Sequence, residues 1–385
     1  KLSQKLMVLN FGPGHPAAHG VLRLVIELSH EVLSRIDVHV GLLHRSTEKL
    51  MELKSLVQIL PYFDRLDYMS CFAQEDALIS AMSSYLDMEM LWQSSTLRLE
   101  LLEITRLLNH FLAIACHVAD IGAITPILWL FEERERYYEL LERLTGSRMH
   151  NTMFVPFLSV GLASSGWLID LYSLSEITVS RIEECLLLFD DSSLIASRLH
   201  NIGVVSFVEL LSMMITGPIL RSSGISFDVR TWMLDVYAKL TIGVCYSSLC
   251  DCYDRLFIRS MECLESIRLI LIGMSTYLVD SVNQRRGIIY HSNIISMEMM
   301  ISLFVRLCAV GTEYATTVTG WNESPKGLFG VYMAWMNDCW LFRGKIRCTG
   351  IHHLMGMLIF TRGDLIADLV AVIGTIDIVF GEIDR

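Results

Sequence analysis

Apolar and polar residues alternate in the first part of the chain. Apolar side chains occupy every second position from Leu22 to Leu28, and again from Ile36 to Leu42. A period of two places such side chains on one face of a half-buried strand. The preceding loop from Gly12 to Pro16 holds two glycines and two prolines, which a helix interior does not tolerate. We therefore expect an antiparallel β-region over residues 1–45.

The pattern becomes helical from Thr47 onwards, because apolar residues then recur with the spacing of one helix face. Proline and glycine predict the helix ends. Pro61 should end the first helix, Pro126 should end or kink the third, and Gly146 should end the fourth. The predicted helices cover residues 47–60, 67–92, 96–125, 131–144, 175–195, 230–280 and 290–315.

The last part of the chain returns to strands. Residues 331–346 have a strand-like pattern, and residues 373–380 read as a final buried strand. We find no internal repeat and no flexible linker, so one domain is the economical interpretation. The predicted fold class is α+β, in which a central helical bundle (46–315) lies between an N-terminal antiparallel sheet (1–45) and a C-terminal β/α region (316–385).

Composition changes this picture in one respect. Hydrophobic residues make up 52% of the chain and charged residues 19%, against about 25% charged in average proteins. The net charge of −11 argues against nucleic-acid binding, which needs a basic face. A polytopic membrane protein is one explanation of the apolar excess. The candidate spans 111–131, 202–220 and 299–310 are each interrupted by a charge or a proline, so we favour a helical core that packs against partner subunits.

The ten cysteines are scattered through apolar stretches and form no Cys-x-x-Cys pair. This pattern is typical of buried free thiols in a reducing compartment, and it does not favour a zinc or iron–sulfur site in this chain. Residues 1–10 lack the apolar core of a secretory signal, although a removed transit segment remains an alternative.

Four segments carry more polar residues than a core needs: GPGHPAAHG (12–20), GLLHRSTEKL (41–50), PYFDRLDY (61–68), and Asp120 with His117. In the first, His15 and His19 either present an imidazole to a ligand or satisfy carbonyl groups of the loop. A carboxylate such as Asp120 in an apolar run must be paired, protonated or functional, so a structural ion pair is the other interpretation.

The order of the segments decides the interpretation. Several motifs reach eight residues or more, and they keep a collinear spacing along essentially the whole chain. The chain thereby closely resembles the quinone-site subunit of respiratory complex I, which is the 49-kDa subunit, also called subunit 7. The motifs that carry the resemblance are the first three segments, EITRLLNH, ADIGAITP, FEERER and IGTIDIVFGEIDR, with further anchors in IGVVS, CDCYDR and ESPKGLFGVY.

The resemblance implies a fold like that of NiFe-hydrogenase large subunits, which share this ancestry. Hydrogenases hold their metal with two Cys-x-x-Cys pairs. Residues 44–47 and 380–385 stand near the expected positions here, and neither segment contains cysteine, so a thiolate-bound metal lacks its ligands. A hydrogenase-like metalloenzyme subunit stays as an alternative. The resemblance implies instead that the emptied site receives the ubiquinone headgroup.

Three site residues follow from the resemblance. His19 matches the histidine that bonds one quinone carbonyl, Tyr68 matches the tyrosine that bonds the other, and Asp120 matches the aspartate that partners this histidine. Quinone reduction takes two electrons and two protons, and a histidine and a phenol can supply the protons locally. A pure scaffold role is a further alternative, which the presence of all three residues disfavours.

Arg45 and Arg65 match arginines that approach a 4Fe–4S cluster in the neighbouring small subunit, and His150 matches a histidine whose protonation follows the redox state of that cluster. Positive charge near a cluster favours its reduced form. A structural ion-pair role for the arginines is the alternative. The chain itself is expected to bind no cofactor and no metal.

The resemblance further implies a place in the peripheral arm of NADH:ubiquinone oxidoreductase, on the matrix side of the mitochondrial inner membrane, and a role in proton pumping. The implied partners are the cluster-bearing subunit, a 30-kDa-type peripheral subunit and membrane-arm subunits. The chain departs from the family pattern at Gly14, where Gln is usual, and at Ser46, where Gly is usual. Residues 152–165 and 275–322 match poorly.

Overall fold

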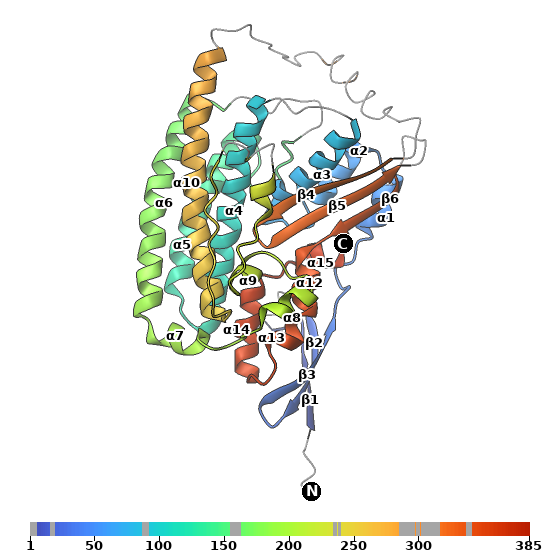
Figure 1. Cartoon of the computed structure of the whole chain (residues 1–385), viewed down its shortest axis with the longest axis vertical. Helices are drawn as coiled ribbons and strands as arrows, with labels where there is room; N and C mark the ends of the chain where they lie inside the picture. Colours follow the sequence, from blue (N-terminus) through green and yellow to red (C-terminus); the bar gives the residue numbers. More distant parts are fainter. Residues whose placement is uncertain are drawn as a thin grey trace.

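The computed structural model describes residues 6–15, 20–86, 92–154, 163–233, 237, 240–284, 297, 301, 316–335 and 341–385. The described part is elongated (Figure 1). Long helices run along one side, a three-stranded sheet lies beside them, and a second three-stranded sheet forms the end of the molecule near the N-terminus.

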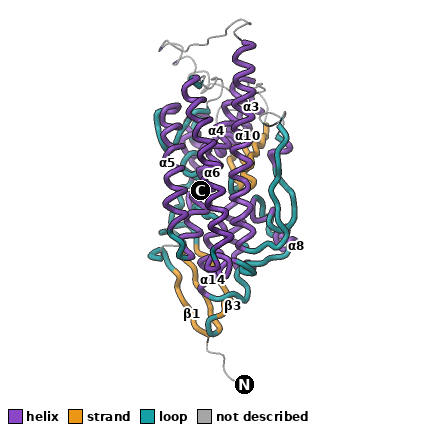
Figure 2. The backbone as a smooth tube through the Cα atoms, turned by 90° about the vertical axis from the view of Figure 1, so that its left-hand side faces the viewer, coloured by secondary structure: helices purple, strands orange, loops and turns teal. Residues whose placement is uncertain are grey.

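Four long helices lie side by side and form a bundle (Figures 1 and 2). They are α4 (Trp92–Ile121), α5 (Thr125–Thr145), α6 (Ser165–Asp191) and α10 (Cys252–Gln284). Helix α4 packs against α5 and α10, and α6 packs against α5 and α10 as well. The expected central helical bundle is therefore confirmed for the described residues.

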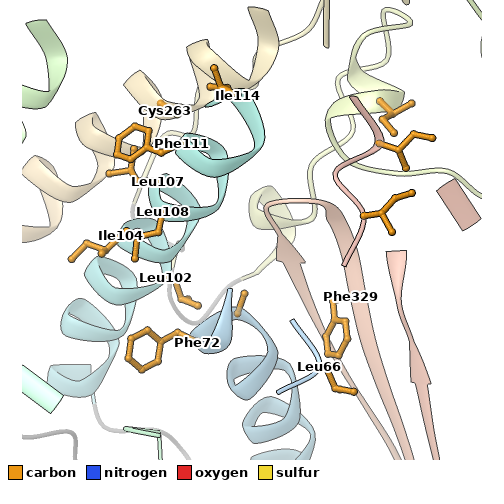
Figure 3. Packing of buried hydrophobic residues seen from close by; sticks show 14 of the residues in the cluster. Leu66, Phe72, Leu102, Ile104, Leu107, Leu108, Phe111, Ile114, Cys263 and Phe329 are labelled. Carbon is orange, nitrogen blue, oxygen red and sulfur yellow. The ribbon is translucent and has the colours of Figure 1, made fainter. Parts of the chain in front are cut away.

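Helix α4 is buried on nearly every side. Figure 3 shows leucine, isoleucine and phenylalanine side chains along it, from Leu102 to Ile114, with Cys263 of α10 opposite. A helix that is buried on nearly every side is stable only when neighbouring elements cover it. Helix α4 therefore forms the middle of the bundle, with α5 and α10 packed against it.

The C-terminal sheet consists of β4 (Thr316–Ser324), β5 (Gly327–Trp335) and β6 (Leu341–Arg347), antiparallel and in that order. Helix α3 (Cys71–Leu86) packs directly on β4. A Cβ atom at Gly320 would lie 2.0 Å from the carbonyl oxygen of Ala77, so only glycine permits this approach of helix and strand.

The N-terminal sheet consists of β1 (Leu6–Phe11), β2 (Arg23–Ser29) and β3 (Val32–His39). Leu24, Ile26 and Leu28 of β2 are buried, as their alternation with polar residues predicts. The expected antiparallel ribbon is therefore confirmed. Strand β3, the second strand of the predicted ribbon, begins four residues earlier than predicted, at Val32 rather than Ile36.

Short helices complete the chain between these parts. They are α1 (Thr47–Leu53), α2 (Leu56–Phe63), α7 (Ser193–Leu199), α8 (Phe207–Ser212), α9 (Pro218–Arg221), the 3-10 helix η2 (Val229–Trp232), α12 (Thr349–Met355), α13 (Met357–Phe360), α14 (Ile366–Ile376) and α15 (Phe380–Asp384).

The two prolines do not act as predicted. Pro61 lies inside α2, which continues to Phe63, so it does not end the helix. Pro126 belongs to the first turn of α5, where its missing N–H group has no partner to lose. It therefore begins a helix rather than ending one. Gly146 ends α5 in the left-handed conformation, with φ of 81°, and this prediction is confirmed.

Other predicted elements need correction. The first predicted helix (47–60) is divided into α1 and α2, because Lys54 and Ser55 have extended backbones. Among the described residues of the predicted helix 230–280, the regular α-helix begins only at Cys252. The predicted strand 373–380 is instead the end of α14, a short turn and the start of α15. The predicted helix 290–315 lies almost entirely outside the described residues.

The apolar stretches do not form a set of membrane spans in the described residues. One helical segment there, Thr96–Ile121, is long and apolar enough to cross a bilayer, and 89% of its apolar window is buried inside the protein, as in a core helix. The candidate span 111–131 bends between α4 and α5, and 202–220 is a loop with two short helices. The candidate 299–310 lies outside the described residues, apart from Ile301.

All eight cysteines in the described ranges are free thiols, and six of them are buried. Cys308 and Cys339 lie outside those ranges. Within the same ranges, no three His, Cys, Asp or Glu side chains gather where they could hold a metal ion.

Candidate functional site at the turn after helix α2

The turn between α2 and α3, residues 64–70, contains or contacts most of the predicted site residues. Its anchor is Asp67, whose side chain is completely buried. The Asp67 carboxylate accepts hydrogen bonds from the Met69 N–H at 3.1 Å and from the Ser70 hydroxyl at 2.6 Å. The backbone N–H of Asp67 donates to the side-chain oxygen of Gln74 at 3.2 Å. These bonds fix the backbone on both sides of Tyr68.

A buried lysine neutralises this anchor. Lys326, in the β4–β5 turn, donates from Nζ to Asp67 at 2.7 Å and to the Asn109 side-chain oxygen of α4 at 2.7 Å. Asn109 in turn donates to Asp377 at 2.8 Å. Burial lowers the pKa of Lys326, but Asp377 and Asp67 outweigh it, so the net pKa lies above its usual value. The lysine therefore remains charged.

Close backbone packing buries this lysine. A Cβ atom at Gly217 would lie 2.4 Å from the carbonyl oxygen of Lys326, and φ of Gly217 is 78°. Only glycine combines this conformation with this approach. The loop before α9 thereby closes over the β4–β5 turn and keeps water from the Lys326–Asp67 pair.

Tyr68 projects from the fixed turn and is 41% exposed. Partial burial raises the pKa of its phenol, Lys326 opposes this effect, and Asp67 adds to it. The phenol therefore stays protonated at neutral pH and can donate a hydrogen bond. The structure thus offers a rigidly held phenol at the protein surface.

Arg45 and Arg65 come together on the same turn. Arg45 donates to the carbonyl oxygen of Arg65 at 2.5 Å, and Arg65 donates to the carbonyl oxygen of Pro61 at 2.7 Å. Both arginines are exposed and, among the described residues, neither guanidinium forms an ion pair. The alternative of a structural ion pair therefore has no support there. An open groove of about 450 Å³ lies beside Arg65, lined also by Lys54 and Tyr62.

His150 also reaches this turn. Its Nδ1 lies 3.4 Å from the carbonyl oxygen of Asp64, the residue before Arg65. The side chain is half-buried, and its backbone is left-handed, with φ of 55°. The three residues predicted to face a neighbouring cluster thus gather around residues 64–65, whereas Tyr68 lies three residues further along.

The remaining predicted residues do not lie on this turn or are not described by the structure. His19 lies outside the described residues. Asp120 lies on the last turn of α4 and is exposed, so it is not the buried carboxylate that the apolar run suggested. His117 is buried against Gly374 of α14, and burial chiefly lowers its pKa to about 3. The charges of Asp377 and Arg134 influence the pKa values of both Cys116 and Tyr68. The pKa of Cys116 is also raised by the charge of Asp120.

The C-terminal segment closes the site from the other side. The Asp384 carboxylate accepts from the N–H groups of Gly41 at 2.9 Å and Leu43 at 2.7 Å, and His44 contacts its carbonyl oxygen at 2.6 Å. Residues 44–47 and 380–385 are therefore neighbours in space. Neither segment contains cysteine, so the hydrogenase-like alternative lacks thiolate ligands at this junction.

Sequence reasoning assigned no role to Lys326, Asn109 or Asp377. A lysine in a Pro-Lys-Gly turn normally reads as exposed, and only the surrounding loop shows that it is buried. The available signal was position, because Lys326 and Asp377 both lie in motifs that carry the family resemblance.

Ser46 also departs from expectation in an informative way. It precedes α1 with φ of 55° and ψ of 37°, a region that glycine adopts without strain. Ser46 therefore adopts the left-handed conformation that suits the glycine expected at this position.

Comparison with known proteins decides the family. The family model for the 49-kDa subunit of the respiratory-chain NADH dehydrogenase matches residues 120–385. The NADH-ubiquinone oxidoreductase 49 kDa subunit of Reclinomonas americana is 41% identical over 396 residues, which cover 100% of this chain and 99% of the relative. This chain belongs to that family.

Other members match over a similar length. The corresponding NADH-quinone oxidoreductase subunit of Rickettsia felis is 40% identical, and NADH dehydrogenase [ubiquinone] iron-sulfur protein 2 of Nephroselmis olivacea is 39% identical. Each match covers 99% of this chain, and they cover 99% and 97% of the relatives. The family predicted from the motif order is thereby confirmed, and with it membership of the complex I oxidoreductase.

Proposed function

We propose that this chain forms the ubiquinone headgroup site of NADH:ubiquinone oxidoreductase. In this proposal Tyr68 donates its phenol proton to one quinone carbonyl, and His19 donates to the other. The names of the relatives, which refer to ubiquinone or quinone as the electron acceptor, support this substrate. The observation that carries the proposal is the half-exposed phenol of Tyr68 on a turn that Asp67 holds rigid.

The chemistry suits these residue types. A quinone accepts two electrons and two protons, and a carbonyl oxygen gains basicity as electrons arrive. A protonated phenol at hydrogen-bond distance stabilises this developing charge and can deliver its proton. Burial keeps the pKa of Tyr68 above its usual value, so the proton is present when it is needed.

Asp120 is proposed to act on the histidine rather than on the quinone. A carboxylate beside an imidazole stabilises its protonated form. Asp120 lies on the last turn of α4, and α4 also carries Asn109, which bonds Lys326. We propose that reduction changes the charge around this aspartate and that this change begins the coupling to proton pumping.

Electrons are proposed to arrive from the opposite side of the turn. Arg45, Arg65 and His150 would face a 4Fe–4S cluster held by the neighbouring small subunit, and that cluster supplies single electrons when present. The exposed guanidinium groups of Arg45 and Arg65 would favour its reduced form. Their place around residues 64–65, beside Tyr68, agrees with short electron transfer across the turn.

The proposed setting is the peripheral arm of complex I at the matrix side of the mitochondrial inner membrane. The proposed partners are the cluster-bearing subunit, a 30-kDa-type subunit and membrane-arm subunits. Exposed apolar side chains suit a chain embedded among partners. They include Ile124, Leu128, Leu187, Val208 and Trp232.

Replacement of Tyr68 by phenylalanine tests the proposal. Tyr68→Phe keeps the ring and the turn but removes the phenol proton, so quinone reductase activity of the assembled complex should fall by about 10²–10⁴-fold. Assembly, followed by native gel electrophoresis, should be unchanged, and so should NADH oxidation with an artificial acceptor.

The matched control is Tyr172→Phe. Tyr172 is 49% exposed on α6, so it has a similar exposure at a place outside the proposed site. This variant should retain full activity. Normal quinone reductase activity in Tyr68→Phe would contradict the proposed role of the phenol.

A further inference from the structure

Two buried acids meet behind the turn. Asp64, just after α2, and Glu75, on α3, are both completely buried. The Asp64 carboxylate accepts from the Thr152 hydroxyl at 2.5 Å, and the Glu75 carboxylate accepts from the Phe154 N–H at 3.4 Å. Each acid therefore has one oxygen bound to the segment 152–154.

The other oxygen of each acid has no donor among the described residues. Asp64 Oδ1 and Glu75 Oε1 are both buried there and accept no hydrogen bond from an N–H or O–H group. The two side chains nevertheless lie within hydrogen-bonding reach of each other. Two carboxylates that touch in a buried place repel strongly, and a single proton between them removes both problems.

No cation in the described residues takes the place of that proton. Arg98 of α4 is bound to Asp76, the residue after Glu75, and Asn322 of β4 also donates to Asp76. The other titratable groups around the pair are Cys71 on α3, Asp67 on the turn and His150. Cys71 donates to the Asp64 carbonyl oxygen at 3.4 Å, and burial keeps its pKa above the usual value. The charges of Arg134 and Cys71 both influence the pKa of Tyr138 on α5.

We propose that Asp64 and Glu75 share one proton between Oδ1 and Oε1, and that this protonated pair is a positioning device for His150. The inference rests on the proposed function, because it matters for electron delivery only if His150 faces the neighbouring cluster.

The contacts show how the pair positions His150. Asp64 holds Thr152 by its side chain and lies beside His150 through its carbonyl oxygen, at 3.4 Å. Glu75 holds the N–H of Phe154. The segment 150–154 is thus attached to α2 and α3 through the two acids. If the pair separates, His150 loses its support from both helices.

The proton also sets the direction of the pH response. The pKa of Glu75 is raised well above its usual value. Burial is the largest cause, and the neighbouring Asp64 carboxyl group is the next. In this proposal the pair carries one proton and one negative charge at neutral pH. At alkaline pH hydroxide removes the proton as water, two carboxylates remain in contact, and their repulsion loosens the segment 150–154.

The decisive variant is Glu75→Gln in the assembled complex. The Gln amide donates permanently to Asp64, so the bridge remains but no longer titrates. Activity at neutral pH should be unchanged, and the alkaline decline of quinone reductase activity should move upward by at least about one pH unit, a tenfold change in proton affinity. The infrared band of a protonated buried carboxyl group should disappear. An unmoved alkaline decline, or an unchanged band, would overturn the proposal.

Asp64→Asn provides the mirror experiment. The Asn amide then donates to Glu75, so this variant should show the same upward movement and the same loss of the infrared band. Because both amide variants keep the bridge, failure of both to assemble would also overturn the proposal.

Glu100→Gln is the matched control. Glu100 of α4 is also a buried acid, but it lies against Gly273 of α10, and among the described residues it has neither a hydrogen-bond donor nor a second acid as a partner. It should lose its own carboxyl band and leave the alkaline decline of activity in place. A shift of the decline as large as that of Glu75→Gln would mean that any buried acid has this effect, and would overturn the special role of the pair.

The infrared measurement separates this inference from the proposed function. It reports the shared proton whether or not Tyr68 contacts a quinone. If Tyr68→Phe kept full activity while Glu75→Gln lost the band and moved the alkaline decline, the proposed phenol role would fail and the proton-sharing pair would stand.

Discussion

Asp64 and Asp67 are three residues apart in one turn, both are completely buried, and their charges are managed in opposite ways. Asp67 is neutralised by Lys326, a fixed cation at 2.7 Å. Asp64 meets a second acid, Glu75, without a cation among the described residues. The cluster at Asp67 is balanced by an opposite charge, whereas in our proposal the cluster at Asp64 is balanced by a proton.

The difference shows how one turn can be held rigidly at Asp67 and can respond to pH at Asp64. The Lys326 pKa is raised, so its stabilising contribution is present below the usual lysine value of 10.5 and is lost only above it. Burial raises the pKa of Asp377, but the charges of Lys326 and Arg259 outweigh burial, so the net pKa lies below its usual value. The contribution of Asp377 to stability is therefore lost only in acid. The raised pKa of Glu75 makes its contribution fall as pH rises above 4.5.

The largest effect should come from Lys326→Met, which converts the balanced cluster into an unbalanced one. Removal of one partner of a buried pair typically costs about 3–5 kcal/mol, because the other charge remains buried alone. Assembled complex should therefore accumulate poorly, and its thermal midpoint should fall. Lys345→Met is the control, since Lys345 is exposed on β6 and should have little effect. Wild-type stability of Lys326→Met would refute the balanced-cluster interpretation.

An intermediate effect is expected from Ser70→Ala, which weakens the same cluster without unbalancing it. The Ser70 hydroxyl donates to Asp67 at 2.6 Å, and a hydrogen bond to a charged group contributes about 1.5–3 kcal/mol. The thermal midpoint of the complex should fall less than in Lys326→Met. Ser84→Ala removes an exposed hydroxyl on α3 and provides the baseline. A loss as large as that of Lys326→Met would contradict this ranking.

The smallest effect should come from Glu100→Gln, which tests an unbalanced acid with no partner in the described part of the chain. Burial raises the pKa of Glu100 from 4.5 to about 8. Its contribution to stability is therefore full below pH 4.5 and is lost as pH rises to about 8. Glu100→Gln should flatten this decline in a series of thermal midpoints. If the decline kept its slope, Glu100 would not be its source.

The sequence predicts the elements whose periodicity is strong and local. The alternation in residues 22–28 and the long apolar pattern of α4 each correspond to one environment, so they are correctly predicted. Residues 373–380 mislead, because a fully buried helix and a buried strand have the same apolar composition and only packing separates them. Pro61 and Pro126 mislead because proline is tolerated in several positions near a helix end.

The site is predictable only where a motif places its residues close together in the chain. Arg65 and Tyr68 lie in one segment, so their turn could be recognised. Lys326 is 259 residues from Asp67 and contacts it only after the sheet, α4 and the C-terminal segment have packed. The pairing of Asp64 with Glu75 depends likewise on the packing of α2 against α3, and no local pattern of residues predicts that packing.

The closure of the loop at Gly41 and Leu43 by Asp384 has a consequence for synthesis. The two hydrogen bonds join residues 343 and 341 positions apart, so the loop that carries Arg45 cannot settle until the segment that contains Asp384 has left the ribosome. Contacts of such long range form late, since their loop-closure entropy must first be overcome. Nascent chains that stop short of Asp384 would therefore lack an ordered arginine loop, and an incomplete copy would be poorly suited to receive an electron-carrying partner.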